Sequence, residues 1–147
     1  MKIMSWNCRG LGNLRAGTVL SHLVKEQAPN VLFFIETKQM VDKMKKVQAD
    51  LRYDNLLVAP CVHRAGGLAM HWKNGVNLDI QTYSLNHIDA RIMTNPHAPW
   101  RIIGFYGKLE ERRKQESWRF LKHRHSKDNV PWVCIRDFNE ILCSTEK

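Results

Sequence analysis

The feature that most constrains the fold is an unbroken apolar run, Val31-Leu32-Phe33-Phe34-Ile35. The run follows Pro29-Asn30 and gives way to Glu36-Thr37-Lys38, so turn-forming or polar residues bound it on both sides. A strand with one solvated face would alternate apolar and polar residues, because successive side chains point to opposite faces of a sheet. The run therefore predicts a short strand that is buried on both faces.

Helices are expected before and after this strand. Before it, apolar residues from Ala16 to Val24 recur at the spacing of one helical face, with Asn13 suited to the N-cap and Pro29 ending the helix. After it, apolar residues from Met40 to Leu51 recur at helical intervals with charged residues between them. This second pattern predicts a surface helix with one buried stripe, and its two methionines are expected in the core rather than in any chemistry.

The hydrophobic period changes to two between Leu56 and Tyr106, which is typical of strands. Strands are predicted at Leu56–Ala59, Gly67–Trp72, Leu78–Ser84, His87–Met93 and Trp100–Tyr106. Lys73-Asn74-Gly75 is suited to a tight turn between two of them. The apolar and polar residues of Leu78–Ser84 and His87–Met93 alternate, which predicts half-buried antiparallel strands in a sheet built from hairpins.

The two ends of the chain add further elements. A strand is predicted at Lys2–Trp6, before a glycine-containing loop, and a buried strand at Trp132–Ile135. Between them, Glu110 to His125 is expected to be helical, with Trp118 and Leu121 facing inward. Its basic residues are expected to face mostly outward: Arg112, Arg113, Lys114, Lys122 and Arg124. The order of elements predicts an α/β fold of packed sheets flanked by helices, in a single domain over residues 1–147.

Three predicted strands run directly into a polar residue of catalytic type: Asn7, Glu36 and Asp137. If these strands neighbour one another in one orientation, their ends converge at one place at the rim of the core. Glu36 and Asp137 would supply oxygen ligands for Mg²⁺, and an amide would orient a water or phosphate without adding negative charge. The alternative is that each residue is only the first solvated residue of a loop or a helix cap, a reading that suits Glu36 because Thr37 and Lys38 follow it.

The charge balance favours a polyanionic partner. Lys and Arg number 23 against 14 Asp and Glu, for a net charge of +9, and neutralising phosphates releases condensed counterions. Nucleic acid is the first interpretation, although charge alone does not separate it from an anionic membrane or an acidic protein. The four cysteines show no C-x-x-C spacing: Cys8, Cys61, Cys134 and Cys143. Reduced thiols without a disulfide partner are therefore expected. No signal or membrane-spanning run is present in the sequence, which favours an intracellular place, nucleus or cytoplasm.

Five blocks together carry a family resemblance: Trp6–Asn13, Ile35–Lys38, Gly66–Ala69, Gly104–Gly107 and Asp137–Glu140. In this order they resemble the endonuclease/exonuclease/phosphatase family. The likeness is greatest to the endonuclease that opens the polyprotein of plant LINE-type retroelements. The resemblance implies a four-layer sandwich of two mixed β-sheets flanked by helices, incomplete at the C-terminus.

The resemblance also implies roles for individual residues. Asn7 would lie in the active site, Glu36 would bind the divalent metal, and Tyr106 would contact the phosphate. Asp137 and Asn139 would position and activate the attacking water. The implied cofactor is Mg²⁺, with Mn²⁺ as the alternative, and the implied partner is DNA.

Two departures from the family pattern put activity in doubt. Arg136 stands where the family has a small glycine, so a long cation is expected to crowd the site or to pair with Asp137. Family members also continue past this block to a closing Ser-Asp-His, and this chain holds no counterpart up to Lys147. His87, the histidine nearest an acid in sequence, is interpreted as an ordinary strand residue rather than a substitute catalyst.

Three functions are therefore compared. The first is a Mg²⁺-dependent endonuclease that nicks DNA, expected to be inactive as this chain stands. The second is a catalytically dead remnant that at most binds nucleic acid, and the third is a phosphatase of the same fold. The candidate nucleic-acid contacts are Arg9, Arg112, Arg113, Lys114, Lys122 and Arg124. For the helical members of this set, a simple solvated helix face is an equal alternative.

Overall fold

The computed structural model describes residues 1–12, 14–63, 66–94, 98–106, 111–126 and 129–137. The elements in order are β1 (Ile3–Asn7), α1 (Leu14–Gln27), β2 (Val31–Ile35), α2 (Val41–Leu51), β3 (Asn55–Ala59), β4 (Leu68–Trp72), β5 (Leu78–Ser84), β6 (His87–Met93), β7 (Pro99–Tyr106), α3 (Glu111–His125) and β8 (Trp132–Asp137). The predicted order of strands and helices is confirmed. The largest difference in strand bounds is at β8, which continues past Ile135 to Asp137.

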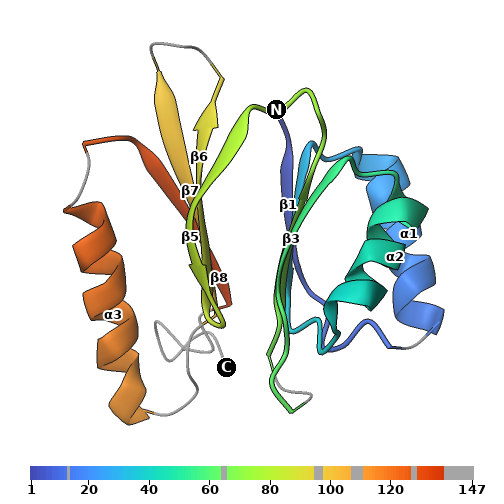
Figure 1. Cartoon of the computed structure of the whole chain (residues 1–147), viewed down its shortest axis with the longest axis horizontal. Coiled ribbons are helices and arrows are strands. Elements are labelled where there is room, and N and C mark those ends of the chain that lie inside the picture. Colours follow the sequence, from blue (N-terminus) through green and yellow to red (C-terminus); the bar gives the residue numbers. More distant parts are fainter. Residues whose placement is uncertain (13, 64–65, 95–97, 107–110, 127–128, 138–147) are drawn as a thin grey trace, which may run out of the picture.

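The strands form two four-stranded sheets, with orders β1-β2-β4-β3 and β5-β6-β7-β8. The pairs β1–β2 and β7–β8 are parallel and the other pairs are antiparallel, so both sheets are mixed. Figure 1 shows the two sheets face to face, with α1 and α2 outside the first sheet and α3 outside the second. The predicted α/β sandwich of two mixed sheets flanked by helices is confirmed.

β2 lies at the centre of the packing, and all five of its residues are buried. Val31, Phe33 and Ile35 face the core between the two sheets, while Leu32 and Phe34 face the core beneath α1 and α2. This alternation follows from the two-residue period of a strand. It confirms the prediction that the apolar run is buried on both faces.

The two sheets meet closely at Phe33 and Gly104. A Cβ atom added to Gly104 of β7 would lie 2.3 Å from the Phe33 ring, far inside van der Waals contact. Glycine at this position therefore lets an aromatic side chain from the opposite sheet fill the space above β7. This packing fixes the separation of the two sheets near the ends of β2 and β7.

The polar face of β6 differs from the prediction that it is half exposed. Asp89 and His87 are both buried because α3 covers this face. Asp89 accepts hydrogen bonds from Arg101 Nε at 2.7 Å and Nη2 at 2.6 Å, and Arg124 Nη1 lies 3.6 Å from the same carboxylate. His87 is hydrogen bonded to Ser84 at 2.7 Å, which supports its interpretation as a strand residue. A buried carboxylate is tolerated here because a bidentate guanidinium compensates its desolvation.

Three apolar side chains expected in the core are substantially exposed. Met40 is 60% exposed because it precedes the first turn of α2, whereas Met44 of the same helix is fully buried. Trp118 of α3 is 41% exposed, against the prediction that it faces inward, while Leu121 is buried as predicted. Val133 is 48% exposed on β8, which among the described strands pairs with β7 alone. The prediction of a fully buried last strand is therefore wrong.

Two further observations concern thiols and helix length. Cys8, Cys61 and Cys134, the cysteines within the described ranges, are all free thiols. Among the described residues, no helix is both long and apolar enough to cross a membrane.

Candidate active site

Asn7, Glu36 and Tyr106 meet at one end of the sandwich, and together they form the Glu36 cluster. Asn7 ends β1 and pairs in parallel register with Ile35, which places Asn7 beside Glu36. The Asn7 Nδ2 group donates a hydrogen bond to Glu36 Oε1 at 3.1 Å, and the Tyr106 hydroxyl donates to the same oxygen at 3.1 Å. Three residues from three separate parts of the sequence therefore converge on one carboxylate.

The sequence predicts that Asn7, Glu36 and Asp137 converge if their strands neighbour one another in one orientation. The structure instead has two parallel pairs, β1–β2 and β7–β8, in facing sheets. The carboxyl ends of β1, β2 and β7 then meet across the gap between sheets. Asp137 is the register partner of Tyr106, so its backbone lies at this same end. The Asp137 side chain and the whole of Asn139 lie outside the described residues.

Glu36 is held in an unusual backbone conformation. Its φ is +55°, in the left-handed region that non-glycine residues occupy only when their surroundings enforce it. Gly10 N–H donates to the Glu36 carbonyl at 2.8 Å, and Thr37 N–H donates to the Gly67 carbonyl at 3.1 Å. Such enforced strain is typical of functional positions. The alternative interpretation of Glu36 as a helix start is wrong, since α2 begins at Val41.

Gly67 makes this arrangement of the loop possible. Its φ is +89°, and a Cβ atom there would lie 2.4 Å from the Thr37 hydroxyl oxygen. Only glycine accommodates both the backbone conformation and the close approach. Thr37 is fully buried, whereas Lys38 and Met40 after it are exposed.

The surroundings of the carboxylate are weakly basic and part-buried. The Glu36 side chain is 17% exposed, and Lys38 Nζ lies 3.9 Å from Oε2. Cys8, next to Asn7, donates its S–H to the Ile35 carbonyl at 3.2 Å. Burial raises the pKa of the Cys8 thiol to about 11, so the thiol is protonated at neutral pH. Lys38 was not among the predicted site residues, although its position two residues after Glu36 was a signal for it.

The residues fit a hard cation through Glu36. Mg²⁺ prefers oxygen ligands and commonly takes one or two carboxylates together with waters and phosphate oxygens. Glu36 supplies one such carboxylate, and the Asn7 side-chain oxygen already accepts from Arg9 N–H at 3.1 Å. Within the described ranges, no group of three or more His, Cys, Asp or Glu residues could hold a metal ion. The described cluster is therefore suited to a metal shared with substrate and water rather than to a closed protein cage.

Arg136 lies away from the Glu36 cluster, against the expectation that it crowds the site. Its guanidinium carbon lies 5.5 Å from the centre of the Phe105 ring and 5.3 Å from that of the Trp118 ring. Phe105 is its register partner on β7, and Trp118 belongs to α3. The guanidinium therefore packs on the α3 face of the second sheet through cation–π contacts. The expected pairing with Asp137 concerns a side chain outside the described part.

The predicted nucleic-acid contacts do not all lie together. Arg9 is exposed directly after β1 and next to the cluster, and Lys122 is exposed on α3. Arg124 is turned toward Asp89 and its side chain is only 14% exposed, so it departs from the predicted outward face. Arg112, Arg113 and Lys114 lie in the first turns of α3, and their side chains lie outside the description. Lys122 and Arg124 belong to α3, which covers the outer face of the second sheet (Figure 1). Of the described candidate nucleic-acid contacts, Arg9 is therefore the one beside the Glu36 cluster.

Comparison with known proteins identifies the fold. No protein-family model matches the sequence, and no curated protein matches it either. An AP endonuclease from Archaeoglobus fulgidus superposes with a TM-score of 0.71 over 95% of this chain and 57% of its own length, at 18% identity. The human Nocturnin catalytic domain, with bound sulfate, gives 0.68 over 96% and 64%, at 12% identity.

An endonuclease/exonuclease/phosphatase family protein from Bacteroides thetaiotaomicron gives a TM-score of 0.67 over 95% of this chain and 63% of its own length, at 11% identity. The chain therefore has the endonuclease/exonuclease/phosphatase fold. It spans less than two thirds of each of these three structures. Identities this low show the fold alone.

Proposed function

We propose that this chain is part of a divalent-metal-dependent phosphodiester hydrolase that acts on nucleic acid. The observation that carries the proposal is that Asn7 and Tyr106 both donate to the same carboxylate oxygen of Glu36. Glu36 itself has a strained backbone conformation. A merely solvated loop glutamate would not need the two neutral donors.

Each residue has a distinct part in the proposed chemistry. Glu36 would hold Mg²⁺ or Mn²⁺, and the bound ion would withdraw charge from a phosphoryl oxygen. Asn7 orients the Glu36 carboxylate through its amide. The Tyr106 hydroxyl, which donates to Glu36 without substrate, is placed to donate to a phosphate oxygen instead. Asp137, at the adjoining strand end, and Asn139 are proposed to hold the attacking water.

More specifically, we propose a DNA-nicking endonuclease domain of a plant LINE-type retroelement. This chain by itself is expected to have little activity. The net charge of +9 and the exposed Arg9 beside the cluster support a nucleic-acid substrate.

The experiment is a nicking assay on supercoiled plasmid with Mg²⁺, using the chain, Glu36→Gln and the control Glu26→Gln. Glu26 is an exposed residue near the end of α1. Little or no nicking by the chain is expected, and any nicking that is seen should be abolished by Glu36→Gln and preserved by Glu26→Gln. Nicking that is insensitive to Glu36→Gln contradicts the assignment of the site, and robust nicking abolished by Glu36→Gln contradicts only the weak activity of the chain.

A further inference from the structure

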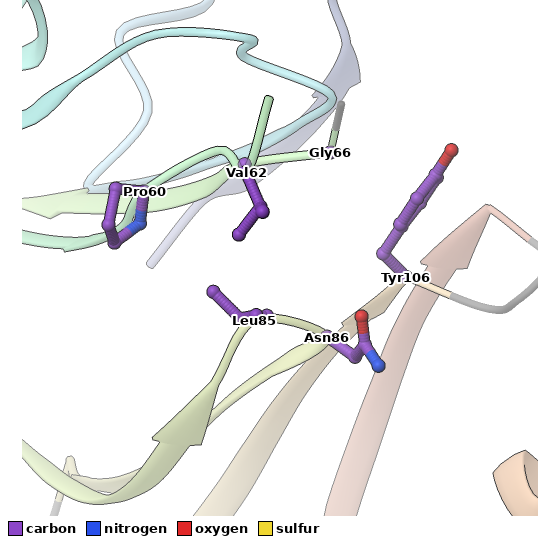
Figure 2. Close-up of a pocket in the computed structure, with 7 residues that line it drawn as sticks. Pro60, Val62, Gly66, Leu85, Asn86 and Tyr106 are labelled. Atoms are coloured by element: carbon purple, nitrogen blue, oxygen red, sulfur yellow. The ribbon is translucent and has the colours of Figure 1, made fainter. Parts of the chain in front are cut away.

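A pocket of about 340 Å³ opens beside Tyr106. It is lined by Pro60, Val62, Gly66, Gly67, Leu85, Asn86 and Tyr106. This volume lies within the range of about 300 to 1,000 Å³ that is typical of small-ligand sites. Figure 2 shows Val62 and Leu85 approaching one another from opposite walls of this pocket.

The two apolar walls come from different sheets. Val62 lies in the connection between β3 and β4, and Leu85 lies in the turn between β5 and β6. Val62 is 46% exposed and Leu85 is 51% exposed, so both present apolar surface to solvent across the opening. Two such side chains facing each other form a slot suited to a flat apolar ligand.

Both walls are tied by backbone hydrogen bonds to the Glu36 cluster. On one wall, Lys38 N–H donates to the Gly66 carbonyl at 3.0 Å, two residues after Glu36. On the other wall, Tyr106 N–H donates to the Asn86 carbonyl at 2.8 Å. The slot is therefore held at a fixed position beside the carboxylate and the tyrosine hydroxyl, as a preorganised subsite requires.

Asn86 adds polar recognition to the apolar slot. Hydrogen bonds hold both backbone polar groups of Asn86. Its carbonyl accepts from Tyr106 N–H, and its N–H donates to the Ser84 hydroxyl at 3.1 Å. Its side-chain amide lines the pocket together with Tyr106 (Figure 2) and carries both a donor and an acceptor. A side chain of this kind pairs well with the edge of a nucleobase.

We propose that this pocket binds an unpaired nucleobase of the nucleic acid whose phosphodiester lies at the Glu36 cluster. The inference rests on the proposed function and adds a specificity site to it. Val62 and Leu85 contact the two faces of the base, and the Asn86 amide contacts its edge. A base in a duplex stack presents neither face, so the pocket selects single-stranded or unpaired positions.

The test is a binding measurement that does not depend on cleavage. Fluorescence anisotropy gives the Kd of the chain for a short single-stranded thymidine oligonucleotide, and for the same backbone with abasic tetrahydrofuran sugars in place of the nucleosides. Leu85→Ala is compared with Leu14→Ala, which makes the same change at a residue that is 94% exposed on α1. Asn86→Ala is compared with Asn77→Ala, an exposed residue outside this pocket.

The unmodified chain is expected to prefer the base-bearing oligonucleotide, and Leu85→Ala to reduce that preference about threefold to tenfold. Asn86→Ala should also reduce the preference for the base-bearing oligonucleotide, whereas the controls Leu14→Ala and Asn77→Ala should retain it. The proposal is overturned if the unmodified chain shows no preference, if Leu85→Ala leaves the preference intact, or if Leu14→Ala removes it equally. Base preference together with nicking that is insensitive to Glu36→Gln would contradict only the proposed hydrolase site, and nicking without base preference would contradict only this pocket.

Discussion

The Tyr106 hydroxyl donates a hydrogen bond to Glu36 Oε1 at 3.1 Å, joining the end of β7 in one sheet to the end of β2 in the other. The two residues are 70 positions apart in sequence. In the proposed function, this contact sets the distance between the residue that donates to phosphate and the residue that binds the metal.

Tyr106→Phe tests this contact. The substitution keeps the ring and removes the donor, so the free energy of unfolding should fall by about 1 to 3 kcal/mol, the range for a hydrogen bond to a charged group. Urea denaturation measures the change. Tyr83→Phe is the control, because Tyr83 is 57% exposed on β5 and should change stability little. Equal stability of the two variants would show that the Tyr106 hydroxyl contributes nothing to the fold.

Gly104→Ala tests the close approach of the sheets. An added methyl group meets the Phe33 ring, so the variant should lose about 1 to 3 kcal/mol of stability through overpacking. Combining it with Phe33→Leu should cost less than the sum of the two single changes, because the smaller side chain makes room. Gly17→Ala on α1 has open space around it and should be neutral or stabilise by up to about 1 kcal/mol. Strict additivity of the Phe33 and Gly104 changes would contradict the contact.

Asp89→Ala tests the buried ion pair beneath α3. Removing the carboxylate leaves the Arg101 guanidinium, which is 6% exposed, without its bidentate partner. The expected loss is about 3 to 5 kcal/mol in the free energy of unfolding. Asp79→Ala on the exposed face of β5 should stay within about 0.5 kcal/mol of the unmodified chain. A small effect at Asp89 would mean that α3 is held by its apolar contacts alone.

The order of elements and the double burial of β2 were predictable because each depends on local periodicity. The Asn7–Glu36–Tyr106 convergence was predictable only in part. Strand ends were visible in the sequence, but the distribution of those strands between two facing sheets depends on long-range pairing.

Two of the wrong predictions share a physical cause. Alternation in β6 identifies which residues share a face, yet it does not reveal that α3 covers the polar face and buries Asp89. The same covering layer explains Arg136, whose partners Phe105 and Trp118 come from a strand and a helix distant in sequence. The strained backbone of Glu36 could not be predicted, because no residue type around it indicates a left-handed conformation there.

His71 predicts how stability depends on pH. It is fully buried between Phe34 and Tyr53, and neither ring nitrogen has a hydrogen-bond partner among the described residues. Burial lowers its pKa from 6.5 to about 4, against a smaller opposing effect of the Met44 backbone. Between these pH values the unfolded chain binds the proton and the folded chain does not, so stability should fall as pH decreases from 6.5 to about 4.

The size of this effect is at most about 3 kcal/mol for His71. His71→Met keeps an apolar side chain of similar volume and removes the titration. Denaturation at several pH values should show a flatter pH dependence for the variant, with the remaining slope including His87, whose pKa burial also lowers to about 4. An unchanged slope would show that His71 binds the proton equally in the folded and unfolded chains.

Mn²⁺ binding followed by NMR tests the central claim, which is that Glu36 is the metal ligand at the meeting point of the two sheets. In the isotope-labelled chain, Mn²⁺ should broaden the side-chain amide signals of Asn7, whose Nδ2 lies 3.1 Å from Glu36 Oε1. Glu36→Gln should abolish that broadening, and Glu26→Gln should retain it. Broadening at Asn7 that survives Glu36→Gln, or none in the unmodified chain, would contradict the account.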